Sequence, residues 1–205
     1  MTSDNLDLTD NASSFTDLAS TPAKLASLDI ASINKSALFT KEECATILTS
    51  CIEELWMPST VVGTANLHLS KRQKLRGDVQ GFPFLNIREV TKTANDEIYD
   101  FNLLGIIDQD FPQLFKYTEN SFYNWHIDLN TIAPSRKITF IINLTDTSEY
   151  TGGEIEFLNI DTSTANVSEQ GTCLIFPSFM PWRVNPVKSG CKNIIVGHVH
   201  GALFK

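Results

Sequence analysis

The last strongly apolar stretch of the chain reads KNIIVGHV and covers residues 192–199. Its apolar content is high for its length, which is typical of a strand covered on both faces and therefore central in a sheet. Further short apolar stretches precede it, closed by turns that contain glycine or proline, at residues 117–128, 137–144, 154–158, 172–176 and 182–187. This run of short strands predicts a β-sandwich or a β-barrel.

The first half of the chain carries helical patterns instead. Thr40 and Glu43 have the spacing of a capping box, and apolar residues repeat at helical spacing from there to Leu55. A second short helix is expected within residues 93–104, whereas the polar and basic segment 71–85 is expected to be a solvated loop. Helices followed by many strands predict a mainly-β, α+β fold with N-terminal helices packed outside the sandwich or barrel.

Length, composition and charge indicate one globular domain with an acidic surface. The chain has 205 residues, 42% of them hydrophobic, with 24 acidic against 16 basic side chains and a net charge of −8. Residues 1–28 are rich in Ser, Thr, Asp and Asn and are expected to form a mobile or loosely docked leader, with residues 29–205 as a single domain. A chain with this excess of negative charge is not expected to bind the phosphate backbone of nucleic acid.

No membrane or export signal is expected. No stretch approaches the roughly 18 apolar residues of a spanning helix, and the first residues lack a basic region followed by an apolar run. A cytoplasmic, intracellular location is therefore expected. The oligomeric state cannot be read from the sequence.

A site that depends on imidazole must draw on few residues. The four cysteines lack the paired spacing of zinc ligands, and nothing in their pattern requires a disulfide. The four histidines are His68, His126, His198 and His200. His68 is interpreted as an ordinary strand residue, and His200, close to the chain end, as a residue at the surface end of a strand.

The tripeptide His126-Ile127-Asp128 is the first candidate metal site. Residues two apart on a strand face the same way, so this imidazole and this carboxylate can point together into a barrel mouth. One neutral nitrogen and one hard anionic oxygen suit Fe(II), Mn(II) or Zn(II). Taken alone, such a pair also occurs by chance in many strands.

The pair stands within an ordered series of short motifs. These read YNWHID at 123–128, RKITF at 136–140, GGE at 152–154, FPS at 176–178 and RVNPV at 183–187. The series resembles the Fe(II)/2-oxoglutarate-dependent dioxygenases of the prolyl 4-hydroxylase-like, PKHD-type branch, over about residues 37–201. The resemblance implies a double-stranded β-helix (jelly roll) and an enzyme that hydroxylates an unactivated C–H bond. Its expected cofactors are Fe(II), 2-oxoglutarate and O2, with L-ascorbate as an optional addition.

The resemblance also assigns roles to individual residues. Lys192 and Tyr117 align with residues that bind 2-oxoglutarate. A lysine directed inward from an apolar strand would be a costly buried charge without an anionic partner, although it could instead snorkel at the strand edge. Tyr123 and Arg136 align with residues that contact the peptide substrate, with a core tyrosine and a surface arginine as the alternatives.

One position departs from the family pattern. The second metal histidine is expected ten residues before Lys192, where this chain has Trp182. Indole has no lone pair to offer a metal, so Trp182 cannot be a ligand. Trp182 is grouped instead with the expected substrate contacts. Six residues after Lys192, where the family commonly has tryptophan, the chain has His198. Because Lys192 and His198 share one strand face, His198 becomes the candidate third ligand beside His126 and Asp128. Otherwise the metal would be bound weakly by two residues, or not at all.

Three functions stay open at this point. The first is a hydroxylase acting on a peptide, a protein or a small molecule, with a prolyl residue or free proline as the favoured target. The second is a non-catalytic family member in which Trp182 blocks the metal site and the barrel serves as a binding module. The third is a cupin-like or capsid-like jelly roll in which the pair His126 and Asp128 is incidental. Neither nucleic acid nor a membrane is an expected partner.

Overall fold

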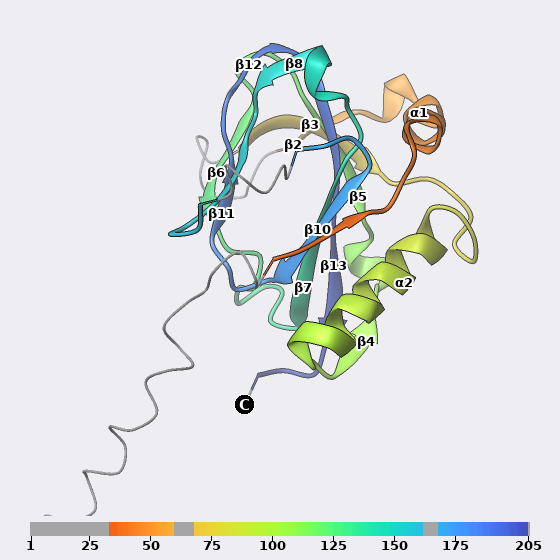
Figure 1. Ribbon diagram of the computed structural model, residues 1–205, viewed down its shortest axis with the longest axis vertical. Coiled ribbons are helices and arrows are strands. Elements are labelled where there is room, and N and C mark those ends of the chain that lie inside the picture. The colour runs from red at the N-terminus through yellow and green to blue at the C-terminus, as the bar shows by residue number, and fades with distance from the viewer. Residues whose placement is uncertain (1–32, 60–67, 162–167, 205) are drawn as a thin grey trace, which may run out of the picture.

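The computed structural model describes residues 33–59, 68–161 and 168–204. The predicted leader, residues 1–28, lies outside the described residues, so its boundary with the domain stays a prediction. Within the described residues, the strands form two layers and the two α-helices lie on the outside of one layer (Figure 1).

The helices and strands are short. The α-helices are α1 (Lys41–Thr49) and α2 (Phe84–Ala94), and α2 continues into a π-helical turn over Asn95–Tyr99. The strands are β1 (Asn34–Ala37), β2 (Met57–Ser59), β3 (His68–Lys74), β4 (Leu103–Gly105), β5 (Gln113–Tyr117), β6 (Phe122–His126), β7 (Arg136–Asn143), β8 (Tyr150–Gly152), β9 (Ile155–Phe157), β10 (Thr172–Pro177), β11 (Trp182–Val184), β12 (Val187–Gly190) and β13 (Lys192–Gly201).

One hydrogen-bonded path runs through most strands in the order β1-β10-β7-β13-β5-β3-β6-β11-β9. Strand β3 pairs with β5 over residues 71–74 and with β6 at His68 and Leu69, so the path turns there from the larger layer into the smaller one. The strands β12 and β8 form a separate antiparallel pair. The strand β13 is central, as predicted, and the architecture is the expected mainly-β jelly roll with outer helices.

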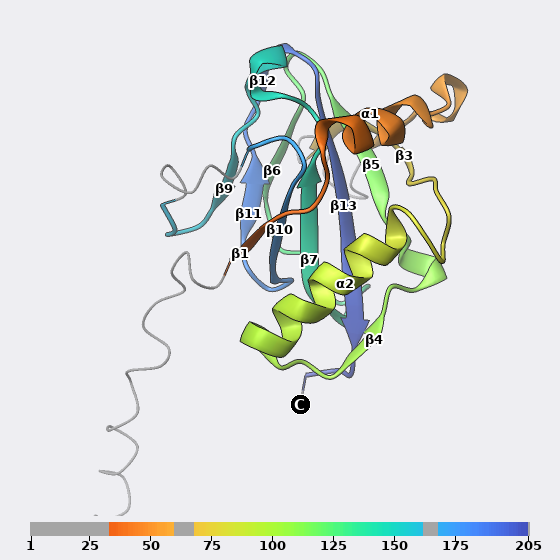
Figure 2. The ribbon, with the colours of Figure 1, turned by 45° about the vertical axis from the view of Figure 1, so that its right-hand side comes forward.

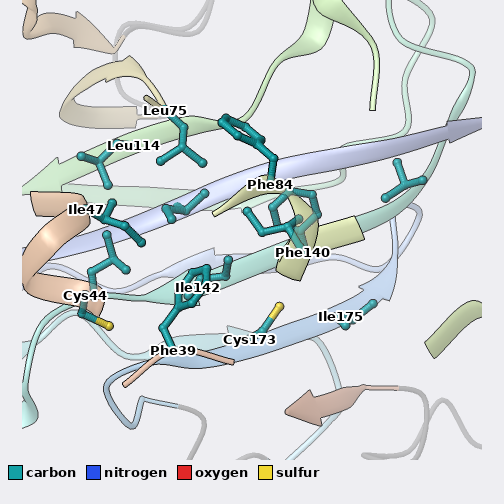
Figure 3. Packing of buried hydrophobic residues seen from close by; sticks show 14 of the residues in the cluster. Phe39, Cys44, Ile47, Leu75, Phe84, Leu114, Phe140, Ile142, Cys173 and Ile175 are labelled. Carbon is teal, nitrogen blue, oxygen red and sulfur yellow. The ribbon is translucent and has the colours of Figure 1, made fainter. Parts of the chain in front are cut away.

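Two cores lie on the two faces of the larger layer. The outer core lies under the helices, where Ile47 of α1 and Phe84 of α2 are buried with Phe140 of β7 (Figure 3). Helix α2 crosses the face of β7 and β13 (Figure 2). The inner core fills the space between the layers, and the fully buried Tyr117 and Trp182 are its largest side chains. This inner core contains the candidate site.

Strand β13 sends alternate residues into the two cores. Ile195 is buried in the outer core under the helices, whereas Ile194 is buried in the inner core. Lys192 and His198 have the parity of Ile194, and both are buried. They therefore face inward on one strand face, as the sequence predicted.

Helix α1 begins where it was predicted to begin and ends earlier. Oγ1 of Thr40 accepts a hydrogen bond from the Glu43 amide at 3.2 Å, and Glu43 Oε2 accepts one from the Thr40 amide at 2.8 Å. The helix ends at Thr49, and the last apolar residues of the predicted stripe, Ile52 and Leu55, are 38% and 46% exposed. These two residues have no core to face, so the helical stripe beyond Thr49 has nothing to stabilise it.

The segment 71–85 is only in part the solvated loop that was expected: residues 76–80 are exposed in turns and bends, whereas its two ends belong to a strand and a helix. Residues 71–74 complete β3, because pairing with β5 supplies the hydrogen bonds that their polar composition does not suggest. Helix α2 begins at Phe84 and continues through the π-helical turn to Tyr99, so the helix expected within residues 93–104 is present over residues 93–99 but begins earlier than expected. The buried residues of α2 do follow a helical stripe, namely Phe84, Ile87, Thr91 and Ala94.

Candidate active site

The inner core encloses a cavity of about 160 Å³. Six of the residues singled out from the sequence line it: Tyr117, Tyr123, Asp128, Arg136, Trp182 and His198. The remaining two, His126 and Lys192, lie beside lining residues, since His126 approaches Asp128 and Lys192 pairs with Tyr117 across β13 and β5. The fold therefore brings all eight to one region of the inner core.

Asp128 has two differently engaged carboxylate oxygens. Oδ2 accepts hydrogen bonds from Trp182 Nε1 at 2.8 Å and from Thr139 Oγ1 at 2.9 Å. Oδ1 faces two imidazoles, with His126 Nε2 at 3.8 Å and His198 Nε2 at 3.5 Å. Burial alone would raise the pKa of Asp128, but its partners, led by His198, hold the pKa well below its usual range. The carboxylate therefore stays ionised, with Oδ2 fixed and Oδ1 turned to the histidines.

His126, the last residue of β6, is oriented by its own backbone. The Asn124 carbonyl lies 2.7 Å from Nδ1 and accepts its proton, and the ring stacks on Tyr123 with centroids 3.5 Å apart. Nε2 is buried and has no hydrogen-bond partner within the described ranges. Burial lowers the pKa of His126, which favours the neutral ring. A bare nitrogen lone pair therefore points toward Asp128.

His198 reaches Asp128 from the opposite layer. Its Nδ1 lies 3.1 Å from Oδ2 of Asp110, and its Nε2 is buried with no hydrogen-bond partner that the described chain provides. Burial disfavours the charged ring, but the carboxylates of Asp110 and Asp128 outweigh it and raise the pKa of His198. As they stand, the described residues contain no group of three or more His, Cys, Asp or Glu side chains arranged to hold a metal ion.

Asp110, which sequence reasoning missed, connects several of these groups. Arg136 donates to it from Nε at 2.7 Å and from Nη2 at 2.8 Å, and His200 Nε2 lies 2.9 Å from Oδ2. His200 is 3% exposed and its Nδ1 contacts Ser135 Oγ at 2.8 Å, so the expected surface position was wrong. Arg136 is held by Asp110 and by the backbone of the site instead of being a free surface arginine.

No local motif marks Asp110. It lies in a short 3-10 turn, Asp108–Asp110, before β5, and meets His198 and His200 only because β5 and β13 pair. The available signal was indirect: a strand with two inward histidines needs a polar partner across the barrel, and Asp110 is the acidic residue just before the neighbouring strand.

Trp182 occupies the position where the family pattern places a metal histidine. It is fully buried, pairs with His126 across β11 and β6, and its ring centroid lies 4.4 Å from that of His126. Its indole hydrogen is donated to Asp128. The side chain therefore lies at the predicted site but supports the carboxylate by hydrogen bonding.

Lys192 is fully buried at the start of β13. Its Nζ donates to the Gly153 carbonyl at 2.7 Å and lies 5.1 Å from the centroid of Tyr150. Burial lowers the pKa of Lys192 to about 7. Gly153 has φ of +66°, and a Cβ there would lie 3.2 Å from Cδ of Lys192, which explains the glycine in the GGE motif.

Comparison with known proteins gives a consistent assignment. Residues 112–200 match the model of the 2OG-Fe(II) oxygenase superfamily. A PKHD-type hydroxylase of Synechococcus sp. strain CC9902 is 31% identical over 153 residues, which cover 72% of this chain and 67% of the relative. The chain belongs to the PKHD-type hydroxylases of the 2OG-Fe(II) oxygenase superfamily.

Further matches to this family are shorter or structural. A PKHD-type hydroxylase of Synechococcus sp. strain CC9311 is 35% identical over 78 residues, or 38% of this chain and 36% of the relative. The chain thus spans between about one third and two thirds of the length of these two relatives. The fold is similar to that of a Trichoplax adhaerens prolyl hydroxylase solved with a hypoxia inducible factor peptide fragment, with a TM-score of 0.64 at 15% identity over 83% of this chain and 84% of that one.

The helices of this family member are short. Over the described ranges, none has the length and apolar content needed to cross a membrane.

Proposed function

We propose that this PKHD-type family member is an Fe(II)- and 2-oxoglutarate-dependent hydroxylase whose iron is held by His126, Asp128 and His198. The supporting observation is that two buried, unpaired imidazole Nε2 atoms face the one Asp128 oxygen left free by Trp182 and Thr139. Buried nitrogens without partners are costly unless a ligand fills the gap. Two imidazoles and one carboxylate are the ligand set of non-haem Fe(II) oxygenases, so the residues present fit this metal.

The protein side chains would supply positioning around this centre. Bound iron, together with 2-oxoglutarate and O2, supplies the oxidation that converts a C–H bond into C–OH. Asp110 holds Nδ1 of His198, so Nε2 stays directed at Asp128. Trp182 fixes the carboxylate and fills the space beside His126, which excludes water from that side. These contacts keep the donors in one orientation before any ligand arrives.

Other residues of the site are proposed to bind the organic reactants. Tyr117 lines the cavity and Lys192 lies next to it, which supports the proposal that both contact 2-oxoglutarate. Tyr123 and Trp182 line the same cavity and are proposed to contact the substrate. Arg136 acts there indirectly, because its guanidinium is bound to Asp110. A peptidyl or free proline is the proposed substrate class.

A second candidate is a binding module without oxygenase activity. Trp182 stands at the expected metal position and its indole is donated to Asp128. If this hydrogen bond alone stabilises the buried carboxylate, the protein keeps its fold without binding a metal.

Metal affinity of matched histidine variants separates the two candidates. Mn(II) is titrated calorimetrically into wild type, His198→Ala and His200→Ala. Both histidines lie on β13 and contact Asp110, but only His198 turns Nε2 to Asp128. We expect His198→Ala to lose at least about 100-fold in affinity and His200→Ala less than tenfold.

Turnover then tests the enzyme. Wild type supplied with Fe(II), 2-oxoglutarate, ascorbate and O2 is expected to form succinate, while His126→Ala is expected to form none. Equal Mn(II) affinity in the wild type and the His198→Ala variant would remove His198 from the metal site. Absence of succinate formation in metal-loaded wild type would favour the binding module.

A further inference from the structure

Arg72 is a cavity-lining cation whose partner is not supplied by the described chain. The cavity is lined by two arginines and two aspartates, Arg72, Arg136, Asp110 and Asp128. Arg136 and Asp110 form a two-point ion pair at 2.7 and 2.8 Å, and Asp128 faces the imidazoles. Nε of Arg72 is buried with no hydrogen-bond partner in the described ranges.

The strand β3 directs Arg72 into the cavity. Arg72 pairs with Phe115 of β5, and Phe115 and Tyr117 line the same cavity from alternate positions of β5. Its neighbour Lys71 is exposed on the other face of the strand. Arg72 therefore belongs to the inner wall, although the basic segment around it was expected to be a solvated loop.

We propose that Arg72 binds a carboxylate of a small organic acid held in this cavity. A guanidinium is always charged and offers forked donors that match the two oxygens of a carboxylate. Burial of one of its nitrogens without a partner is unfavourable until such a ligand is bound.

The other walls restrict the ligand to a small acid with a carbon skeleton. The cavity holds about 160 Å³, and Phe111, Phe115 and Val196 supply apolar surface beside the charged groups. The acidic side chain of Asp128 lines the same space, which disfavours a doubly charged phosphate group. A carboxylate brings only one negative charge to Arg72, so its repulsion from Asp128 is smaller than that of a phosphate group.

Two reactants could supply this carboxylate. One is 2-oxoglutarate, whose far carboxylate would then bind Arg72 and not Lys192. Lys192 does not line the cavity, and its Nζ already donates a hydrogen bond to the Gly153 carbonyl. The other is a substrate with a free carboxylate. The inference deepens the proposed function, on which it rests for the identity of these reactants.

The first experiment does not need the metal. Glutarate has both carboxylates of 2-oxoglutarate but no keto group to chelate iron, and it is titrated calorimetrically into protein kept metal-free with EDTA. If the dicarboxylate is the partner, Arg72→Gln weakens glutarate binding at least about tenfold, because a charge-assisted hydrogen bond is lost. Arg72→Lys retains part of the affinity, because it keeps the charge but not the fork.

Lys71→Gln is the matched control, since it removes one positive charge from the adjacent, outward-facing position of β3. Its affinity for glutarate is expected to stay within twofold of wild type. Urea unfolding of each variant verifies that the fold is intact before the titrations are compared.

A second pair of titrations identifies the source of the carboxylate. First, Mn(II)-loaded protein is titrated with 2-oxoglutarate. Second, protein saturated with both Mn(II) and 2-oxoglutarate is titrated with L-proline and, separately, with L-prolinamide, which lacks the carboxylate. Tenfold weaker 2-oxoglutarate binding in Arg72→Gln assigns the contact to the co-substrate. Unchanged 2-oxoglutarate binding with loss of the preference for L-proline over L-prolinamide assigns it to the substrate.

The inference would be overturned if wild type bound none of these acids. It would also be overturned if the affinity of Arg72→Gln stayed within twofold of wild type in every titration, or if Lys71→Gln lost as much affinity as Arg72→Gln. Failure of wild type to bind Mn(II) would instead contradict the proposed metal site. In that case the glutarate titration still decides the role of Arg72.

Discussion

Nδ1 of His198 lies 3.1 Å from Oδ2 of Asp110, and this contact leaves the opposite nitrogen of the ring facing Asp128. A carboxylate behind a histidine is the usual way in which proteins fix the orientation of a metal-binding imidazole. The contact joins the turn before β5 to the middle of β13, and Asp110 also binds Arg136 and His200. One carboxylate thus determines the orientation of His198.

Replacing Asp110 by asparagine is expected to weaken Mn(II) binding about 10- to 100-fold, because a neutral amide oxygen holds the Nδ1–H of His198 less strongly than the carboxylate does. Calorimetric titration of the folded variant measures the change. Asp108→Asn is the control, since Asp108 is an exposed member of the same 3-10 turn. If Asp110→Asn binds Mn(II) as tightly as Asp108→Asn does, His198 does not depend on Asp110.

Replacing Trp182 by phenylalanine is expected to lower the free energy of unfolding by about 1–3 kcal/mol, because Asp128 loses a buried donor and the smaller ring leaves a gap. Metal affinity is expected to fall by less than tenfold, because the indole is not a ligand. Urea unfolding and Mn(II) titration measure the two effects separately. Trp125→Phe, at a side chain that is 37% exposed, is the control and should change neither quantity. A loss of Mn(II) binding as large as in His198→Ala would contradict this assignment.

Replacing Lys192 by methionine is expected to stabilise the ligand-free protein at pH 7 by a few kcal/mol. This is the free-energy equivalent of the difference in the pKa of Lys192 between the unfolded and folded states. An unfolded lysine keeps its proton up to a pH of about 10.5, whereas burial lowers the pKa of folded Lys192 to about 7. Folding therefore releases a proton between these pH values, and the wild-type free energy of unfolding rises with pH there. The penalty is fully present below pH 7.

The advantage of Lys192→Met should therefore shrink when urea unfolding is repeated at pH 9.5. The control is Lys188→Met, at an exposed lysine of β12, whose effect on stability should be small and independent of pH. A constant difference between wild type and Lys192→Met from pH 7 to 9.5 would mean that Lys192 is not destabilised by burial.

Replacing Gly197 by alanine is expected to destabilise the protein by about 1–3 kcal/mol, because the added Cβ would lie 2.3 Å from Cζ of Phe140. Phe140→Leu shortens the opposing side chain, so the double variant should lose less than the two single variants together. Thermal or urea unfolding of the four proteins measures this coupling. Strict additivity would show that the ring is not the obstacle.

Sequence patterns predicted the parts of the fold that depend on local alternation or capping. The inward parity of Lys192 and His198 follows from the two-residue repeat of β13, and the start of α1 follows from the pair Thr40 and Glu43. Both rules act within a few residues along the chain. The family motifs extended this to the jelly roll, because their order along the chain reflects the order of the strands.

Contacts between distant segments could not be predicted in the same way. Residues 71–74 are polar and become a strand only by pairing with β5, so Arg72 was placed in a solvated loop. Asp110 and His200 come together only when β5 pairs with β13. Their side chains carry no local signature of burial, which is why the carboxylate that orients His198 and the cation of the cavity were both missed.

The burial of Trp182 gives the site an intrinsic optical reporter. Its indole is fully buried beside His126, whereas Trp125 is 37% exposed and Trp56 is partly buried near Lys116. In a variant with Trp56 and Trp125 replaced by phenylalanine, the tryptophan emission would come from Trp182 alone. A paramagnetic ion such as Mn(II) arriving beside His126 would quench that emission, so occupancy of the centre can be followed by fluorescence without any added dye.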